Sequence, residues 1–285
     1  MASQNCVALP VQYLSIPPPT LSSTPMNTIR PSVLTLLLLI LATSTSALAN
    51  DSEASLVGGS IVLKKSTSIS MEEEELTITP DEVRVRYRFR NHSTSDVATQ
   101  VAFPIRALVM PDEVGDVAGF VQDMRFTVAV EGVAVAVEHT VRQTEDSIEV
   151  MFHWPMTFPA GRTITVTHQY ETRGGYILPD GPGYAEFWKR FSRETCIGSA
   201  LLKKIRRKPL SAQTVDYVLS TGANWRGPIR KFRLVVETDE DGQAIATCMK
   251  GLKKSGRSRY VLDRKNFTPS RELSVTFVNI GRGDR

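Results

Sequence analysis

Apolar and polar residues alternate with a period of two through much of the chain, a pattern typical of β-strands that bury one face. The clearest case is VRVRYRFR at residues 83–90, which has one apolar side and one side of four arginines. A run of four glutamates and the turn-forming sequence TPDE at residues 79–82 precede it. The pattern therefore predicts a β-hairpin over residues 69–90, with its aliphatic face buried and its arginines outward.

The four-residue turn fixes the register of this hairpin. It places Glu75 opposite Arg86 and Glu73 opposite Arg88. The same register pairs apolar residues, Ile78 with Val83 and Leu76 with Val85. Cross-strand pairs of opposite charge contribute about 0.2–1 kcal/mol each, so we interpret the glutamate run as the partner of the arginines rather than as a metal site.

The same alternation predicts strands along the rest of the chain. They cover residues 96–103, 124–131, 133–141, 147–153, 162–171, 214–220, 229–238, 243–249, 258–263 and 272–279. The turn EGV at 131–133 would join two of these strands, and DEDG at 239–242 would make a hairpin of the strands that flank it.

One helical segment interrupts the strands. It is predicted at about residues 185–207, with a break near Gly198 and with Leu201, Leu202 and Ile205 facing inward. Many short strands with one helical insertion predict an all-β fold, in which antiparallel sheets pack as in a β-sandwich.

The N-terminal segment has the features of a secretory leader. An apolar run at residues 33–42 follows Arg30 and is too short to span a bilayer. Ala47-Leu48-Ala49 then supplies the small residues of a cleavage site. We predict a Sec signal peptide within a leader of residues 1–49, cut after Ala49, and a periplasmic or secreted product; an uncut anchor is the alternative. A compact leader would start at Met26, and a Pro-rich disordered head is the other interpretation of what precedes it.

Two cysteines remain in the mature chain, Cys196 and Cys248. In an oxidising compartment such a pair is typical of a disulfide. A catalytic thiol or a metal site is the alternative, but neither cysteine has a further cysteine or histidine at ligand spacing. The sequence predicts no metal site and no cofactor.

Charge is distributed unequally along the mature chain. Residues 50–180 carry 11 Lys and Arg against 20 Asp and Glu, whereas residues 181–285 carry 22 against 10. We therefore divide the chain into an acidic β-rich half, 50–180, and a basic half, 181–285, of a helix followed by strands. Either the two halves face each other, or the basic half meets an anionic surface.

Outside the cytoplasm such a surface would be an anionic envelope component rather than nucleic acid. The run KKIRRK at 203–208 is interpreted first as the solvent-exposed face of an amphipathic helix. The run KGLKKSGRSR at 250–259 lies near a turn that is expected to be exposed. The candidate anionic-surface contacts are Lys203, Lys204, Arg206, Arg207, Lys253, Lys254, Arg257 and Arg259. No transmembrane anchor is expected after signal cleavage.

Motifs of known catalytic sites are absent from the sequence. It contains no G-x-S-x-G, P-loop, G-x-G-x-x-G or H-E-x-x-H sequence. His139, His153 and His168 could meet on adjacent strands, although packing roles are the simpler interpretation. The first hypothesis is thus a non-enzymatic binding or structural envelope protein. The alternative is a cell-envelope carbohydrate hydrolase that uses a carboxylate pair drawn from Asp146, Glu149 and Glu171, which would require two carboxylates in one cleft about 5–10 Å apart.

Several segments together resemble a bacterial secreted family, the Domain of Unknown Function 4424 family. They are ANDSEA, GGSIVL, the hairpin segment ISMEEEELTITPDEVRVRYRFRNHSTSDVATQVAFP, FHWPMTFPAGRTITVTHQYE, YVLSTGANWRGPIRKFRLVVE and FTPSRELSVTF. The TGANW-GPI block is the most specific of them, and Cys196 and Cys248 are similar to a cysteine pair of the family. The resemblance implies an extracytoplasmic, β-rich fold with a disulfide and implies no activity. The 25 residues before Met26 do not match.

Overall fold

The computed structural model describes residues 52–57, 60–108, 116–144, 147–172, 176–178, 184–205, 210–238 and 243–280. The predicted signal peptide, its predicted cleavage site and the expected start at Met26 lie outside these residues. The strands are β1 (Ser52–Val57), β2 (Ser60–Lys64), β3 (Ile69–Ile78), β4 (Glu82–Asn91), β5 (Val97–Leu108), β6 (Thr127–Val130), β7 (Val133–Val135), β8 (Glu138–Gln143), β9 (Ser147–Phe158), β10 (Thr163–Glu171), β11 (Tyr176–Leu178), β12 (Leu210–Tyr217), β13 (Ile229–Glu237), β14 (Gln243–Thr247), β15 (Lys253–Lys254), β16 (Arg259–Phe267) and β17 (Leu273–Asn279). The helices are α1 (Val117–Asp123), α2 (Ala185–Thr195), α3 (Ser199–Ile205) and the 3₁₀ helix η3 (Ser220–Asn224).

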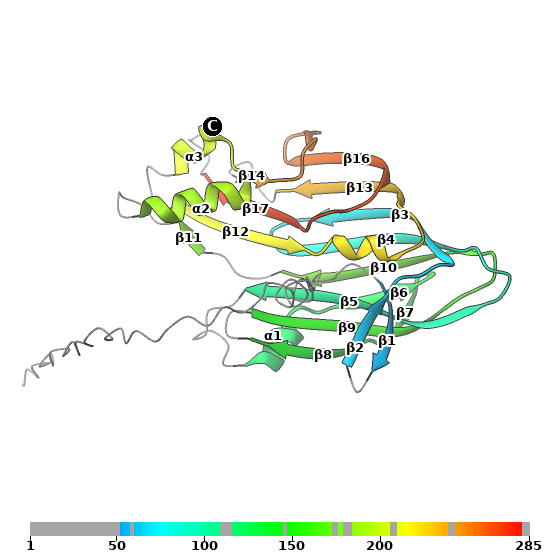
Figure 1. The fold of residues 1–285 in the computed structure, drawn as a ribbon. Coiled ribbons are helices and arrows are strands. Elements are labelled where there is room, and N and C mark those ends of the chain that lie inside the picture. Colours follow the sequence, from blue (N-terminus) through cyan, green and yellow to red (C-terminus); the bar gives the residue numbers. More distant parts are fainter. Residues whose placement is uncertain are drawn as a thin grey trace, which may run out of the picture. The chain divides into compact units, whose positions relative to one another are not determined.

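The described strands form three sheets (Figure 1). The largest has eight strands in the order β15-β16-β13-β3-β4-β10-β6-β7; the others have the orders β2-β1-β5-β9-β8 and β11-β12-β17-β14. The all-β prediction is confirmed. Every pairing is antiparallel except that of β3 with β13, which is parallel. The eight-stranded sheet therefore joins strands from both sides of residue 180.

The predicted β3–β4 hairpin is confirmed in its register. Glu75 pairs with Arg86 and Glu73 with Arg88. The apolar pairs also form as predicted, Ile78 with Val83 and Leu76 with Val85. The sequence did not predict the irregularity between Met71 and Glu73, which bends the ladder near the start of β3.

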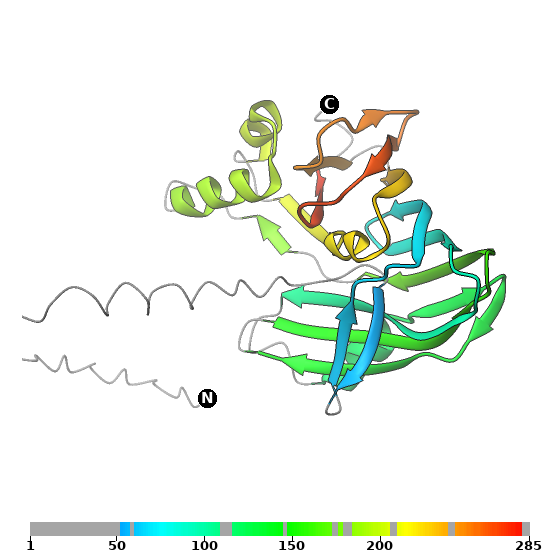
Figure 2. The ribbon, with the colours of Figure 1, turned by 45° about the vertical axis from the view of Figure 1, so that its right-hand side comes forward.

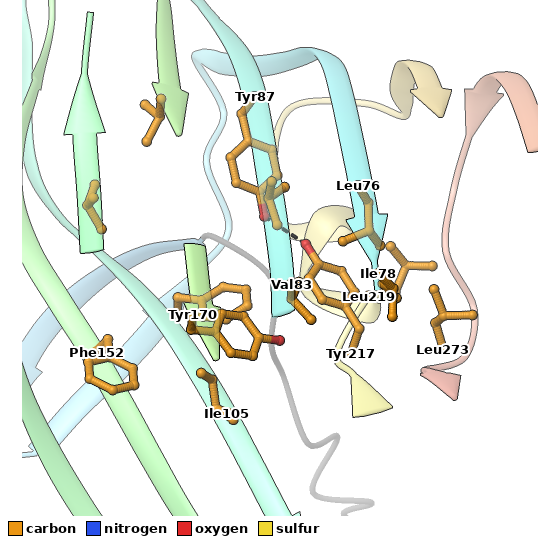
Figure 3. Close-up of a cluster of buried hydrophobic side chains, with 14 of the residues drawn as sticks. Leu76, Ile78, Val83, Tyr87, Ile105, Phe152, Tyr170, Tyr217, Leu219 and Leu273 are labelled. Atoms are coloured by element: carbon orange, nitrogen blue, oxygen red, sulfur yellow. Dashed lines mark hydrogen bonds between the residues drawn. The ribbon is translucent and has the colours of Figure 1, made fainter. Parts of the chain in front are cut away.

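One face of the eight-stranded sheet is buried under the two smaller sheets. Phe103 of β5 shows how the three sheets meet, because its ring lies 4.4 Å from the ring of His168 on β10 and 5.9 Å from that of Tyr217 on β12. A polar contact crosses the same core, since the hydroxyls of Tyr217 and Tyr87 are 2.8 Å apart (Figure 3). The Tyr217 hydroxyl also donates to Glu74 at 3.0 Å. The layers are thus joined by apolar packing and by a buried hydrogen-bonded group.

A second, smaller core lies beneath the helices. Trp188 and Phe191 of α2 and Ile205 of α3 pack with Ala246 and Val278 of the four-stranded sheet, and Figure 2 shows α2 and α3 beside these strands. The break near Gly198 is confirmed, because α2 ends at Thr195 and α3 begins at Ser199. α1 is an additional short helix whose first turn is capped by the Asp116 carboxylate.

The Cys196–Cys248 disulfide is present, with Cα atoms 5.0 Å apart. It links the end of α2 to the residue after β14. In the chain-entropy description, closing a loop of 52 residues stabilises the fold by about 4 kcal/mol. The disulfide therefore fastens the small helical core to its sheet.

Two strand connections differ from the sequence prediction. The turn at 131–133 does join β6 to β7, but the strand predicted over 133–141 divides into β7 of the large sheet and β8 of another sheet. The predicted hairpin of 229–238 with 243–249 is wrong, because β13 pairs with β3 and β16 whereas β14 pairs with β17. Turn residues indicate where a chain reverses, but burial decides which strands pair.

Candidate functional site

The solvent-facing side of the eight-stranded sheet contains a hollow of about 560 Å³. Its borders come from β3, β4, β13 and β16, and we call it the charged hollow. Its outward side chains are Glu73, Glu75, Arg86, Lys231, Arg233, Asp263 and Lys265. Glu74, Phe232 and Arg264 also border it and, by strand alternation, contribute its floor.

Strand register explains how these charges form two rows across the sheet. One row runs Asp263, Arg233, Glu75, Arg86, and the next runs Lys265, Lys231, Glu73. Because side chains two residues apart on a strand share a face, the rows stand on either side of the floor. The hollow therefore lies between two rows of charged side chains that cross the strands, and Arg86 of one row comes within 4.0 Å of Glu73 in the other.

Each carboxylate of the charged hollow lies beside a cation. Lys231 Nζ donates to Glu73 at 2.9 Å, and Arg233 donates to Asp263 at 2.8 Å. Arg86 lies 3.6 Å from Glu75. The hydrogen bond from Lys231 is the largest cause of the lowered pKa of Glu73, to which Arg88 adds. A general acid needs the opposite shift, a raised pKa, so Glu73 suits ionic contacts better than proton transfer.

The basic wall of the charged hollow contains a like-charged pair. Lys231 and Lys265 are directly paired across β13 and β16. Glu73 accepts a hydrogen bond from Lys231, whereas no ion pair is recorded for the exposed Lys265 within the described part of the chain. Like charges that face each other across strands are destabilising, so an anion bound between them would relieve this repulsion.

The predicted anionic-surface residues fall in two places. Lys203 and Lys204 are exposed on α3, beside the small sheet. Lys253 and Lys254 form β15, the edge strand of the sheet that carries the charged hollow. Arg257 and Arg259 follow β15 along the chain, and the Arg259 side chain lies 3.4 Å from that of Glu237. Arg206 and Arg207 lie outside the described residues.

Two of the carboxylates proposed for a hydrolase, Glu149 and Glu171, each pair with an arginine. Glu149 of β9 accepts a hydrogen bond from Arg142 at 2.9 Å, and Glu171 of β10 accepts one from Arg125 at 2.8 Å. These strands belong to different sheets, and Asp146 lies outside the described residues. The carboxylates that do share a hollow are Glu73, Glu75 and Asp263, which the sequence analysis did not select.

The three strand histidines lie in different environments. His139 and His153 sit on neighbouring strands, but their cross-strand partners show that they point to opposite faces of that sheet. His168 is in the main core, where burial lowers its pKa to about 3. Within the described ranges, no group of three or more His, Cys, Asp or Glu residues could hold a metal ion.

The comparison with protein families decides the classification. The model of the Domain of unknown function (DUF4424) family matches residues 49–149 and 142–276. The chain belongs to the DUF4424 family. The family match therefore covers the charged hollow, both cysteines and the TGANW block. No curated protein matches the sequence of this DUF4424 member.

Known structures show the fold of this DUF4424 member but not its activity. A "putative nutrient binding protein" from Legionella pneumophila is 18% identical, with a TM-score of 0.50, over 80% of this chain and 71% of that protein. Leukotriene A4 hydrolase from yeast is 10% identical, with a TM-score of 0.37, over 78% of this chain and 31% of the enzyme. An M1 zinc metallopeptidase from Deinococcus radiodurans is 13% identical, with a TM-score of 0.29, over 75% and 43% of the two chains. The chain thus spans less than half of each enzyme.

Within the described residues, no helix combines the length and the apolar character that crossing a membrane requires.

Proposed function

We propose that this protein is a non-enzymatic binding protein of the cell envelope, and that it binds an anionic envelope component along the charged hollow. The observation that carries the proposal is the chemistry of the hollow. Its outward side chains are four cations and three carboxylates, and each of these carboxylates already has a cationic partner. The unmatched positive charge is therefore available to a ligand.

The shape of the charged hollow favours an extended ligand. Its two rows of side chains cross the strands, and β15 with Lys253 and Lys254 lies beyond β16 at the sheet edge. A linear anionic polymer that runs toward this edge would meet Lys231 of β13 and then Lys265 of β16, and Lys253 of β15 lies further along β16, opposite Val261. A binding role also agrees with the description of the Legionella protein, although that likeness concerns the fold alone.

The compartment is part of this proposal. We place the mature protein in the periplasm or outside the cell, after removal of a Sec signal at Ala49. The disulfide supports this placement, because such bonds persist in oxidising compartments. N-terminal sequencing of exported protein should give Asn50 as the first residue; exported protein that retained residues 1–49 would contradict it.

Binding of a model polyanion tests the function. Dextran sulfate should bind the purified mature protein, neutral dextran should not, and affinity should fall as salt screens the charges. Lys265→Glu should weaken binding, because it reverses a charge of the hollow without removing a recorded ion pair. Lys189→Glu makes the same charge change on exposed α2 and is the control; the ion pair that it removes, with Glu186 at 3.9 Å, is exposed and contributes little to stability.

Two outcomes would reject the hollow as the binding site. Equal binding of dextran and dextran sulfate would remove the electrostatic basis of the proposal. Equal weakening by Lys265→Glu and Lys189→Glu would show that net charge matters and position does not. If Lys203→Glu on α3 weakened binding while Lys265→Glu did not, the predicted helical contacts would replace the hollow.

A further inference from the structure

The TGANW-GPI block builds a rigid loop that the proposed function does not use. Trp225 is fully buried, with its ring 4.5 Å from that of Phe89 and 5.9 Å from that of Phe158. The next residue, Arg226, donates its backbone N–H to the carbonyl of Ile69 at 2.8 Å. Gly227 has a φ of +76°, which side-chain-bearing residues rarely adopt. The core therefore holds the base of the loop, whereas Arg226 is exposed.

This loop brings three arginines to one end of the eight-stranded sheet. Ile69, which accepts the hydrogen bond from Arg226, pairs with Asn91 of β4, so Arg226 lies beside the end of that strand. Arg90 precedes Asn91 and pairs with Ser70. Arg230 lies at the start of β13, one residue before the partner of Glu73. We call Arg90, Arg226 and Arg230 the arginine patch.

The arginine patch carries charge that its own surroundings do not neutralise. All three residues are exposed. Among the described residues, no ion pair is recorded for any of the three guanidinium groups. Glu72 is the nearby carboxylate, and it is engaged by the Ser70 hydroxyl at 2.6 Å. Three like charges on a rigid loop and strand end repel one another unless an anion lies between them.

His92 lies within the patch and has a defined hydrogen-bond arrangement. The Ser70 hydroxyl is 2.6 Å from the Glu72 carboxylate and 2.7 Å from His92 Nε2. The single hydroxyl proton goes to the carboxylate, so Nε2 carries the proton of the neutral ring and Nδ1 is the atom that titrates. Burial lowers the pKa of His92, and Arg226, Arg90 and Arg230 lower it further, whereas Glu72 opposes them.

We propose that the arginine patch is a binding site for a phosphoryl group, with His92 at its border. A guanidinium offers a planar fork of donors that matches phosphate oxygens. A phosphoryl group presents three oxygens and so can engage three forks at once, whereas a carboxylate presents two. The phosphoryl group would belong either to free phosphate or to a phospholipid head group. This site goes beyond the proposed function, because it does not require the charged hollow to bind anything.

The ionisation of His92 gives a direct test with inorganic phosphate as the probe. A bound dianion would offset the arginines, so phosphate should raise the pKa of His92, and NMR of its ring protons measures the change. Chloride at equal ionic strength should raise it much less. The double variant Arg226→Gln, Arg230→Gln should lose the phosphate response, and Arg190→Gln on exposed α2 is the matched control.

The double variant should keep its fold, because Arg226 contacts Ile69 through its backbone and not through its side chain. An unchanged amide spectrum outside the arginine patch checks this. A phosphate response that survives in the double variant, or equal responses to chloride and phosphate, would overturn the proposal. Vesicles of phosphatidylglycerol, with phosphatidylcholine as control, distinguish the sources. Phosphate competition against vesicle binding assigns a lipid head group, and a phosphate response without vesicle binding assigns free phosphate. Lys265→Glu should leave the phosphate response intact, which separates this site from the charged hollow.

Discussion

The two faces of the eight-stranded sheet place glutamate side chains in opposite environments, one buried and one exposed to water. Glu73, Glu74 and Glu75 are consecutive on β3, and alternation turns the middle one inward. Glu74 is 1% exposed and accepts a hydrogen bond from the buried Tyr217, whereas its neighbours lie beside Lys231 and Arg86 in water. A buried carboxylate depends on a fixed partner, while a surface one can exchange its cation for water or for a ligand. One face therefore maintains the fold, and the other can bind.

The largest expected contrast between the faces comes from adjacent residues of β4. Phe89→Ala should lower the free energy of unfolding by about 3–5 kcal/mol, because it empties a fully buried site against Trp225. Arg88→Ala on the other face removes an ion pair with Glu73 and should lower it by less than about 1 kcal/mol. Urea denaturation of both variants measures the difference, and similar losses would contradict the assignment of the two faces.

Acid should destabilise the buried face of the sheet through protonation of His168. Burial lowers the pKa of this histidine from 6.5 to about 3, so the unfolded chain binds its proton at a higher pH than the folded chain. Stability is lost as the pH falls below about 6.5, and this one group contributes about 2 kcal/mol of loss between pH 7 and pH 5.

His168→Phe should remove that part of the acid sensitivity, because a phenyl ring suits the neighbouring ring of Phe103. Denaturation curves at the two pH values measure it. His139→Phe, at an exposed position, is the control. An unchanged pH dependence in His168→Phe would show that the ring is not held neutral by burial.

Removal of one hydroxyl tests the polar link across the core. Tyr217→Phe deletes the group that lies 2.8 Å from the Tyr87 hydroxyl and donates to Glu74. The loss should be about 1.5–3 kcal/mol, since hydrogen bonds to charged groups lie in this range. Burial, and then the charge of Glu74, raise the pKa of Tyr217, so its hydroxyl remains a donor at any physiological pH. Thermal unfolding of the variant measures this loss. Tyr260→Phe, at a half-buried position of β16, is the control and should have little effect on stability.

The smallest effect is expected from the ion pair at the charged hollow. Lys231→Ala should lower stability by about 0.2–1 kcal/mol, because the lysine side chain is 71% exposed and the pair is screened by water. The loss should shrink in 1 M salt. Equal losses in low and high salt would indicate that the packing of the lysine stem, rather than its charge, is what matters.

The sequence determines local features of this fold more completely than distant ones. The β3–β4 register follows from alternation and a four-residue turn, and the α2–α3 break follows from apolar spacing around Gly198. The pairing of β3 with β13 joins residues such as Glu73 and Lys231, which are far apart in the chain. No local pattern contains that information, because it depends on which apolar faces bury one another.

The candidate sites were harder to predict for the same reason. The charges of IRKFRLVVE and LDRKNF were visible as alternating polar positions, but only the sheet order places Lys231 beside Glu73 and Asp263 beside Arg233. A backbone hydrogen bond to Ile69 places Arg226 at the end of β4 that carries Arg90. The TGANW-GPI block stood out in the sequence as the most specific part of the family resemblance, but its arginines had no predicted role.

The central place of β13 in the large sheet has a consequence for the order of folding. β3 can pair with β4 as soon as both have been synthesised, but its other edge has to wait for residues 229–237. Until then the unpaired backbone of β3 is open to wrong partners, and sheets closed by such distant segments form slowly. Almost the entire chain must therefore be present in the compartment where it folds before this sheet can close, and a chain that lacked β13–β17 would present that open edge for aggregation.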